Sequence, residues 1–269
     1  MSVPKVVHFI YTHKNASYGF VFTNYLCVLS AIHHNPGYRV MFWSDMTMDE
    51  IEQHPWVSKL IGKVEFRSQE MPKEIYGQPL KYAAHMSDIV RIQKLQQYGG
   101  IYLDTDILTV RSYDDLLDTG SFIVGRENKK LVGQAVMMAE PGFPLFAEWL
   151  ERYKNFTGSE FKGHDHYRKL KDREERKKEN LLWAGNSLHT LTEILPKYEG
   201  VRVLDRKSFY FPHRHFTETV PFNKDPDLRI PEAYGHHLCF SGNPKLKTLT
   251  PEKIGDGYFG KKVKEFYAN

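Results

Sequence analysis

The sequence predicts an α/β protein with a mostly parallel sheet, and three features of its first 110 residues carry this prediction. Apolar runs rich in β-branched and aromatic residues recur at short intervals, beginning with VPKVVHFIYT at 3–12. Segments with helical spacing separate these runs. Two of the runs end in acidic residues, at Asp45 and Asp106. In open α/β sheets, ligands bind beyond the carboxyl ends of the strands, so these acids mark the edge where we expect a site.

The predicted elements alternate in order along the chain. Strand patterns cover 3–12, 38–45, 63–68 and 101–106, and helix patterns cover 19–34, 46–62 and 79–100. The last helix carries apolar residues every three or four positions and stops at Gly99 and Gly100. Beyond residue 110 the pattern weakens, with strands expected over 121–128, 131–141, 201–205 and 209–213 and helices over 142–156 and 186–198.

Composition sets the broad class of the protein. The 269 residues suffice for one large domain, and 41% hydrophobic with 26% charged residues is typical of a soluble globular chain. Cys27 and Cys239 show no metal-binding spacing and are predicted to be reduced, each buried in apolar surroundings. No signal peptide or membrane-spanning window is recognisable, so we expect the protein in the cytoplasm of a bacterium, or in a host cytosol if a virus encodes it.

Much of the net charge of +4 comes from YRKLKDREERKKEN at 167–180, which is predicted to form one helix with alternating basic and acidic residues. This pattern is typical of a solvated helix face with i,i+4 ion pairs. The alternative is a surface for peripheral contact with an anionic membrane or for an acidic acceptor. No nucleic-acid motif accompanies the charge, so we expect no nucleic-acid partner.

The stretch GGIYLDTDILTV at 99–110 places Asp104 and Asp106 at the end of a buried strand. Carboxylates at i and i+2 can converge where the chain turns after a strand. Carboxylate and water ligands suit Mg²⁺ or Mn²⁺, which also bind nucleotide phosphates. A pair of acids can also transfer protons, so both uses are open at this point.

The preceding helix adds an acid and a base. Asp88 and Arg91 share a face with Ala84 and Leu95, so both side chains are expected to lean toward the strand end. The alternative interpretation is an i,i+3 ion pair on the surface.

These residues resemble a known family, glycosyltransferase family 32, whose sugar-binding region contains a DXD motif. The resemblance rests on PKVVHFIY, then on YAAHMSDIVRIQKLQQYGGIYLDTDI, and is strongest over 3–110. VGQAVMMAEPGFPLF, WAGNSLHTLTEIL and AYGHHLCFSGN are similar to later family segments, although Asn186 replaces a usual proline and a glycine replaces the terminal tryptophan. The family is similar to initiating α-mannosyltransferases, lipid α-galactosyltransferases and clostridial glucosylating toxins.

The resemblance implies a GT-A fold, a Rossmann-like mostly parallel sheet with a variable C-terminal acceptor region. It implies one domain over 1–269, with a nucleotide-sugar half at 1–110 and an acceptor half at 111–269. It also implies a metal-dependent transferase that moves a hexose, with retention, from a UDP- or GDP-linked donor to a glycan or glycolipid, as in polysaccharide biosynthesis. The cofactor would be Mn²⁺ or Mg²⁺.

Site residues follow from the same resemblance. The catalytic group would be Asp104, Asp106, Asp88 and Arg91, and the metal ligands would be Asp104, Asp106 and His237, with His236 as the other candidate of the pair. Nucleotide-sugar contacts are expected from Val7, His8, Phe9, Ile10, Tyr11, Asp88, Arg91, Tyr102, Gln134 and Asn186. His8 is as easily structural as donor-facing. Ser241 and Asn243 are candidates to contact phosphate or metal, and His213 and His215 to pack, to contact the acceptor or to bind metal.

Two other classes compete with this interpretation. A phosphohydrolase of the haloacid dehalogenase type also places D-x-D after an apolar strand. There the first Asp is a nucleophile, and a glycine usually follows the motif near the N-terminus, whereas Ile107 follows it here. A carbohydrate-binding or nucleotide-sugar-binding relative without catalysis is the other alternative.

Overall fold

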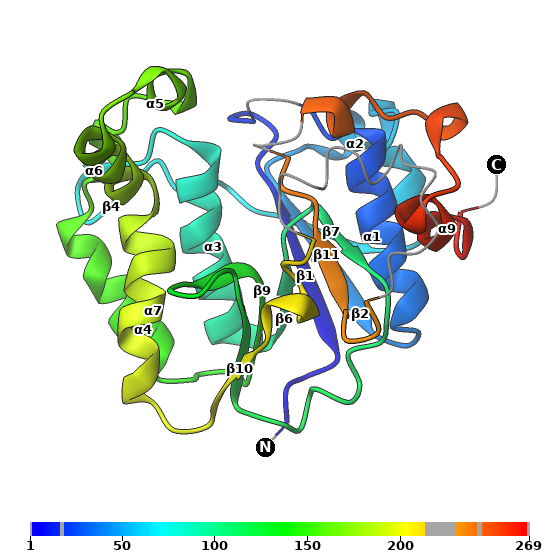
Figure 1. Cartoon of the computed structure of the whole chain (residues 1–269). Coiled ribbons are helices and arrows are strands. Elements are labelled where there is room, and N and C mark those ends of the chain that lie inside the picture. The colour runs from blue at the N-terminus through cyan, green and yellow to red at the C-terminus, as the bar shows by residue number, and fades with distance from the viewer. Residues whose placement is uncertain (1, 17–18, 213–229, 241–243, 268–269) are drawn as a thin grey trace.

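A seven-stranded sheet forms the centre of the computed structural model, which describes residues 2–16, 19–212, 230–240 and 244–267 (Figure 1). The strand order is β10-β8-β9-β6-β1-β2-β3. Only β9 runs antiparallel to its neighbours in this sheet, so the predicted mixed α/β class with a mostly parallel sheet is confirmed. The strands are β1 (Val6–Tyr11), β2 (Arg39–Ser44), β3 (Glu65–Ser68), β6 (Gly100–Leu103), β8 (Phe122–Arg126), β9 (Val132–Ala139) and β10 (Val201–Leu204).

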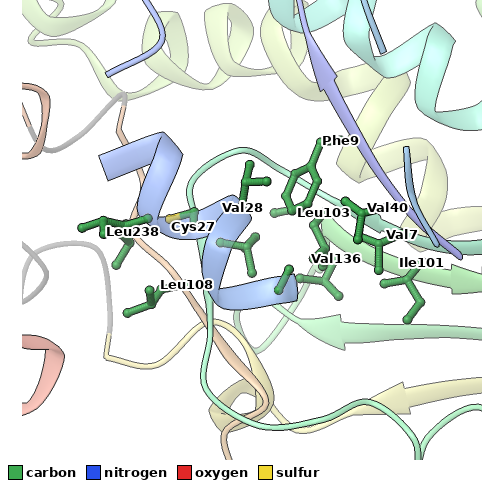
Figure 2. Packing of buried hydrophobic residues seen from close by; sticks show 14 of the residues in the cluster. Val7, Phe9, Cys27, Val28, Val40, Ile101, Leu103, Leu108, Val136 and Leu238 are labelled. Carbon is green, nitrogen blue, oxygen red and sulfur yellow. The ribbon is translucent and has the colours of Figure 1, made fainter. Parts of the chain in front are cut away.

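Helices cover both faces of the sheet, and β1 shows why. Its side chains alternate, so Val7 and Phe9 pack with α1 (Phe22–His34), as Figure 2 shows. Ile10 belongs to the opposite layer, with α3 (Ala83–Tyr98), α4 (Leu145–Glu151) and α7 (Thr190–Ile194). Because a buried Val, Ile or Phe side chain contributes roughly 1.5–3 kcal/mol, these two apolar layers hold the sheet in place.

The remaining elements lie around this frame. They are α2 (Met48–Gln53), α5 (His164–Lys169), α6 (Arg173–Ala184), α9 (Tyr258–Lys264), a hairpin of β4 (Glu74–Ile75) and β5 (Gln78–Pro79), and a pair of β7 (Ile107–Thr109) with β11 (Gly235–His237). Short 3₁₀ turns connect several of them, and a π-helix spans Gly185–His189. Among the described residues, no helix is long and apolar enough to cross a bilayer.

The sequence pattern missed the antiparallel pairing of β7 with β11. Ile107 pairs with His237, and Leu108 pairs with His236. A three-residue strand beside an acidic turn carries no alternation that predicts a partner about 130 residues away. This pairing brings the C-terminal segment to the turn that holds Asp104 and Asp106.

Three predicted elements differ in detail. Pro55 interrupts the helix expected over 46–62, which becomes α2 and a 3₁₀ turn at Ser58–Leu60. The helix expected over 167–180 divides at Leu170, whose backbone is extended, and restarts after Asp172, whose side chain accepts from Glu175 N–H. The strand expected over 209–213 is absent from its described part, where Phe209–Pro212 follow a 3₁₀ turn.

The predicted glycine stop of α3 is confirmed at Gly99 and Gly100, whose φ values are 61° and 90°. A Cβ at Gly100 would lie 2.4 Å from the Val6 carbonyl oxygen, so β6 enters the sheet too close to β1 for any side chain there.

We predict that Gly100→Ala lowers the free energy of unfolding by about 3 kcal/mol or more, because it combines a left-handed backbone with a backbone clash. Gly37→Ala is the matched control, since Gly37 has φ of 81° but a Cβ there would meet no atom within 4 Å, and it should cost about 1 kcal/mol. Urea unfolding of both variants measures the difference. Equal losses would contradict the close approach of β6 to β1.

Candidate active site

The candidate site lies where β6 ends, in the turn at residues 104–106. The Asp104 N–H donates to the Ala135 carbonyl at 2.8 Å, and the Ile107 N–H donates to the Asp104 carbonyl at 3.0 Å. On the other side, the Asn24 amide of α1 donates to the Thr105 carbonyl at 3.0 Å. Backbone bonds from β9 and a side chain from α1 therefore fix the turn before any ligand binds.

Two carboxylates and one imidazole converge at this turn. One ligand atom each from Asp104, Asp106 and His237 lies within 4.8 Å of the others. The second oxygen of Asp106 accepts from the Phe240 N–H at 2.9 Å, which orients its first oxygen toward His237 Nε2 at 3.4 Å. Two oxygens and an imidazole nitrogen at this spacing fit a divalent cation such as Mn²⁺ or Mg²⁺, with further positions open to phosphate or water.

Electrostatics couple His237 to its neighbours. Burial alone would lower the pKa of His237, but Cys239 and Asp106 raise it well above its ordinary value. Burial would raise the pKa of Asp106, yet His237 and the Phe240 N–H hold it below its ordinary value. In the absence of metal, a positive charge on His237 therefore balances the Asp106 carboxylate. A divalent cation would replace that proton.

Cys239 contacts the other side of the His237 ring. Its Sγ lies 3.5 Å from His237 Nδ1 and 3.6 Å from the His237 carbonyl oxygen. The expectation that both cysteines are buried in apolar surroundings holds for Cys27 and is wrong for Cys239, which is half-buried beside an imidazole. An Nδ1–H bonded to sulfur leaves Nε2 directed at Asp106, the orientation that a metal ligand requires.

Arg91 lies behind the carboxylates as a buried cation. Its guanidinium reaches Asp88 at 3.2 Å and Asp104 at 3.3 Å, and it donates to the Gln134 carbonyl at 3.2 Å. It also stacks over the Tyr102 ring, 4.5 Å from the centroid. The Arg91 and Asp88 side chains are only 6% and 5% exposed, so the alternative of a surface ion pair is wrong. The predicted face of α3 does lean toward the strand end.

Asp88 and Tyr102 complete this buried cluster. Burial, with a smaller contribution from Asp104, raises the pKa of Asp88 to about 7, although Arg91 and a 3.0 Å bond from the Gln134 amide oppose the shift. The Tyr102 hydroxyl donates to the same Asp104 oxygen that Arg91 contacts. Asp104 is therefore held by a cation and a hydroxyl from within the fold.

The five β1 residues that were expected to contact the donor are all buried. Val7 and Phe9 are fully buried under α1, and Ile10 and Tyr11 are buried nearer the carboxyl end of the strand. His8 is also fully buried, with Nε2 donating to the Gly99 carbonyl at 2.9 Å and Nδ1 accepting from Trp43 at 3.1 Å. Burial lowers the pKa of His8 to about 4, so the ring is neutral and structural in this fold.

The later candidates separate into two groups. Gln134 joins the Asp88 cluster, whereas the Asn186 side-chain amide donates to the Arg152 carbonyl at 3.0 Å. The Asn186 backbone carbonyl accepts from the Trp149 indole N–H at 2.8 Å. His236 points away from the turn, because Nδ1 donates to the Phe211 carbonyl at 2.6 Å and Nε2 contacts the Tyr258 hydroxyl at 3.0 Å. The candidates His213, His215, Ser241 and Asn243 lie outside the described residues.

Tyr210 is a site neighbour that the sequence pattern did not reveal. Its ring lies edge-on to His237 at 5.7 Å, and its hydroxyl accepts from the Val136 N–H at 3.4 Å. A Cβ at Gly133 would lie 2.1 Å from this ring, and one at Gly125 would lie 3.1 Å from it. Glycines inside two predicted strands were therefore the available signal for a close approach.

This arrangement defines a class of protein: an α/β fold with an acidic turn at the carboxyl edge of a central strand. Residues 24–123 match the family model described as "Glycosyltransferase sugar-binding region containing DXD motif". The chain is similar to this family over that region, and the protein is a glycosyltransferase. The resemblance seen in the sequence is thereby confirmed.

Relatives agree with this assignment. "Glucan organizing enzyme 1" of Cryptococcus neoformans var. grubii is 24% identical over 286 residues, covering 99% of this chain and 71% of that protein. "Mannosyl phosphorylinositol ceramide synthase CSH1" of Saccharomyces cerevisiae is 27% identical over 156 residues, covering 57% of this chain and 36% of that protein. The chain thus spans about a third of the latter's length.

A solved structure shares the fold. The apo-form glycosyltransferase GlyE of Streptococcus pneumoniae TIGR4 has a TM-score of 0.50 at 10% identity, covering 98% of this chain and 60% of that one.

The raised pKa of Asp88 generates a prediction about pH. Because the folded state binds the Asp88 proton more tightly than the unfolded state, this group costs stability progressively as pH rises from about 4 to about 7. Asp88→Asn removes that dependence. Denaturant unfolding across this range should show the wild type losing stability with pH relative to the variant. Parallel profiles would contradict a buried, raised Asp88.

Proposed function

We propose that this protein is a metal-dependent, retaining glycosyltransferase that moves a hexose from a UDP- or GDP-linked donor to a glycan or glycolipid acceptor. The observation that carries the proposal is the convergence of Asp104, Asp106 and His237 at the carboxyl edge of β6. The relative whose name specifies a mannosyl group supports mannose as the first sugar to test. The words "phosphorylinositol ceramide" in the name of that relative also support a lipid acceptor that carries a phosphate group.

Asp104, Asp106 and His237 share one task in this proposal, which is to hold the cation. Asp104, Asp106 and His237 would hold Mn²⁺ or Mg²⁺, which when bound supplies positive charge against the diphosphate leaving group. Preorganised charge matters more than a strong base here, because charge develops on the leaving oxygens as the glycosidic bond breaks. Retention is carried over from the family resemblance.

Arg91 and Asp88 are assigned as positioning residues. Both are about 95% buried, and Arg91 directs its donors to Asp88, Asp104 and the Gln134 carbonyl. Together with Tyr102 it fixes one oxygen of Asp104, which leaves the other oxygen for the cation. The sugar hydroxyls would then meet the partly exposed edge of this cluster, where Gln134 lies.

The family match argues against the phosphohydrolase. The converging Asp104, Asp106 and His237 argue against a binding protein that has lost catalysis. The immobilised Asp104 is also a poor nucleophile, because its oxygen already accepts from Tyr102 and contacts Arg91. We therefore retain the transferase hypothesis over a phosphohydrolase or a binding protein without catalysis.

The proposal is tested with a panel of nucleotide sugars, monitoring release of nucleoside diphosphate with and without Mn²⁺. We predict that Asp106→Asn lowers metal-dependent release by at least about 100-fold, because it removes a ligand that faces the cation. Asp118→Asn, at an exposed position between β7 and β8, is the matched control and should retain activity. Release of inorganic phosphate, or activity that persists without any divalent cation, would overturn the proposal.

Cys239 provides a second test through the orientation of His237. Cys239→Ala removes the sulfur partner of Nδ1 and should weaken Mn²⁺ binding to the apo protein by about 10–100-fold. Cys239→Ser keeps a hydrogen-bond acceptor there and should retain most of the affinity. Electron paramagnetic resonance of free Mn²⁺ measures both. Unchanged affinity in Cys239→Ala would show that His237 needs no partner or is not a ligand.

A further inference from the structure

One segment of the chain carries a net positive charge as large as that of the whole protein. Residues 162–178, here called the basic hairpin, contain eight Lys or Arg against four Asp or Glu. Their net charge of +4 equals that of the entire protein, so the rest of the chain is neutral overall. The hairpin comprises α5, the turn at Leu170 and the first half of α6.

Most of this charge faces solvent. Every residue from 171 to 178 is exposed, and within the hairpin ion pairs form between Arg168 and Asp165 at 2.9 Å and between Lys177 and Glu174 at 3.8 Å. The other six cations have no ion pair with any residue that the structure describes: Lys162, Lys169, Lys171, Arg173, Arg176 and Lys178. The solvated helix with internal pairs that the sequence suggested therefore accounts for only part of the hairpin.

The hairpin stands beside the catalytic end of the fold. The Tyr82 hydroxyl donates to the Phe161 carbonyl at 2.8 Å, and Lys81 Nζ donates to the Ser159 carbonyl at 2.8 Å. Tyr82 is the N-cap of α3, so these bonds join the base of the hairpin to the end of the helix that carries Asp88. Figure 1 shows α5 and α6 together at the upper left, next to α3.

Two further cations belong to the 3₁₀ turn Pro244–Thr248. Lys247, in the 3₁₀ turn Pro244–Thr248, has its pKa lowered by burial and by Arg168 of α5, which places the two cations near each other. The exposed Lys245 belongs to the same turn. One exposed apolar side chain follows the hairpin, Leu181 of α6, which is 45% exposed. Clustered cations beside an exposed leucine are the chemistry that docks on an anionic bilayer.

We propose that the basic hairpin docks the protein on an anionic lipid surface and so presents a phosphate-bearing lipid acceptor to the Asp104–Asp106 turn. The inference rests on the proposed function, because it names the acceptor as lipid-linked. Each cation near an anionic bilayer contributes about 1 kcal/mol, which is a factor of about five in binding, and the attraction weakens as salt screens it.

The test is sedimentation of the full chain with vesicles of phosphatidylcholine alone or with phosphatidylserine added. The hairpin variant carries Lys169→Glu, Lys171→Glu and Lys178→Glu. The matched control carries Lys63→Glu, Lys129→Glu and Lys130→Glu, three exposed lysines outside the hairpin with the same change in net charge. We expect the wild type and the control to bind anionic vesicles at low salt, and the hairpin variant to bind at least about 100-fold more weakly.

Several outcomes would overturn the proposal: equal loss in both variants, equal binding to neutral vesicles, or binding of a short RNA without binding of vesicles. Inorganic phosphate in millimolar excess distinguishes the sources of the anion. Vesicle binding that survives the phosphate supports docking on a bilayer, whereas full displacement indicates a pocket for free phosphate and contradicts docking.

Nucleotide binding separates this inference from the proposed function. Mn²⁺-dependent binding of UDP or GDP is measured without vesicles for the wild type and both variants, with thermal unfolding as the check on folding. Binding that all three retain, together with vesicle binding lost only in the hairpin variant, supports both proposals. Nucleotide binding without vesicle binding by the wild type refutes the docking alone, and vesicle binding without nucleotide binding refutes the transferase mechanism alone.

Discussion

The buried guanidinium of Arg91 is the interaction on which the site depends. It is 6% exposed and lies between two carboxylates, Asp88 and Asp104, so it neutralises charge that the interior would otherwise exclude. Because removing one partner of a buried pair leaves the other charge uncompensated, neither α3 nor the turn at 104 can change independently. The same contacts orient Asp104 toward the open edge of the sheet.

A second constraint completes the site from a distant part of the chain. The pairing of β7 with β11 sets His237 opposite Ile107, next to Asp106. The Phe240 N–H then fixes the Asp106 carboxylate, and the Tyr210 ring packs against His237 where Gly125 and Gly133 leave room. The acidic turn belongs to the N-terminal half of the fold, yet its third candidate ligand comes from the C-terminal half.

The sequence predicted what depends on local periodicity. The strands up to residue 106, the helices α1 and α3, the glycine stop of α3 and the facing of Asp88 and Arg91 all follow from spacing within one element. The helix expected over 46–62 is the exception, because Pro55 interrupts it. It could not predict which of His236 and His237 faces Asp106, because the register of β11 against β7 is a tertiary property. Nor could it predict that Asn186 bonds to α4, that Cys239 contacts an imidazole, or that the helix over 167–180 divides at Leu170.

The central claim is that one cation is held jointly by the acidic turn and by His237. A crystal soaked with Mn²⁺ and a nucleoside diphosphate tests it most directly, through the anomalous signal of the metal. The account predicts a peak about 2.1 Å from an oxygen of Asp104 or Asp106 and at a similar distance from His237 Nε2, with diphosphate oxygens in the remaining positions. A metal bound elsewhere, with His237 still bonded to Asp106, would contradict it.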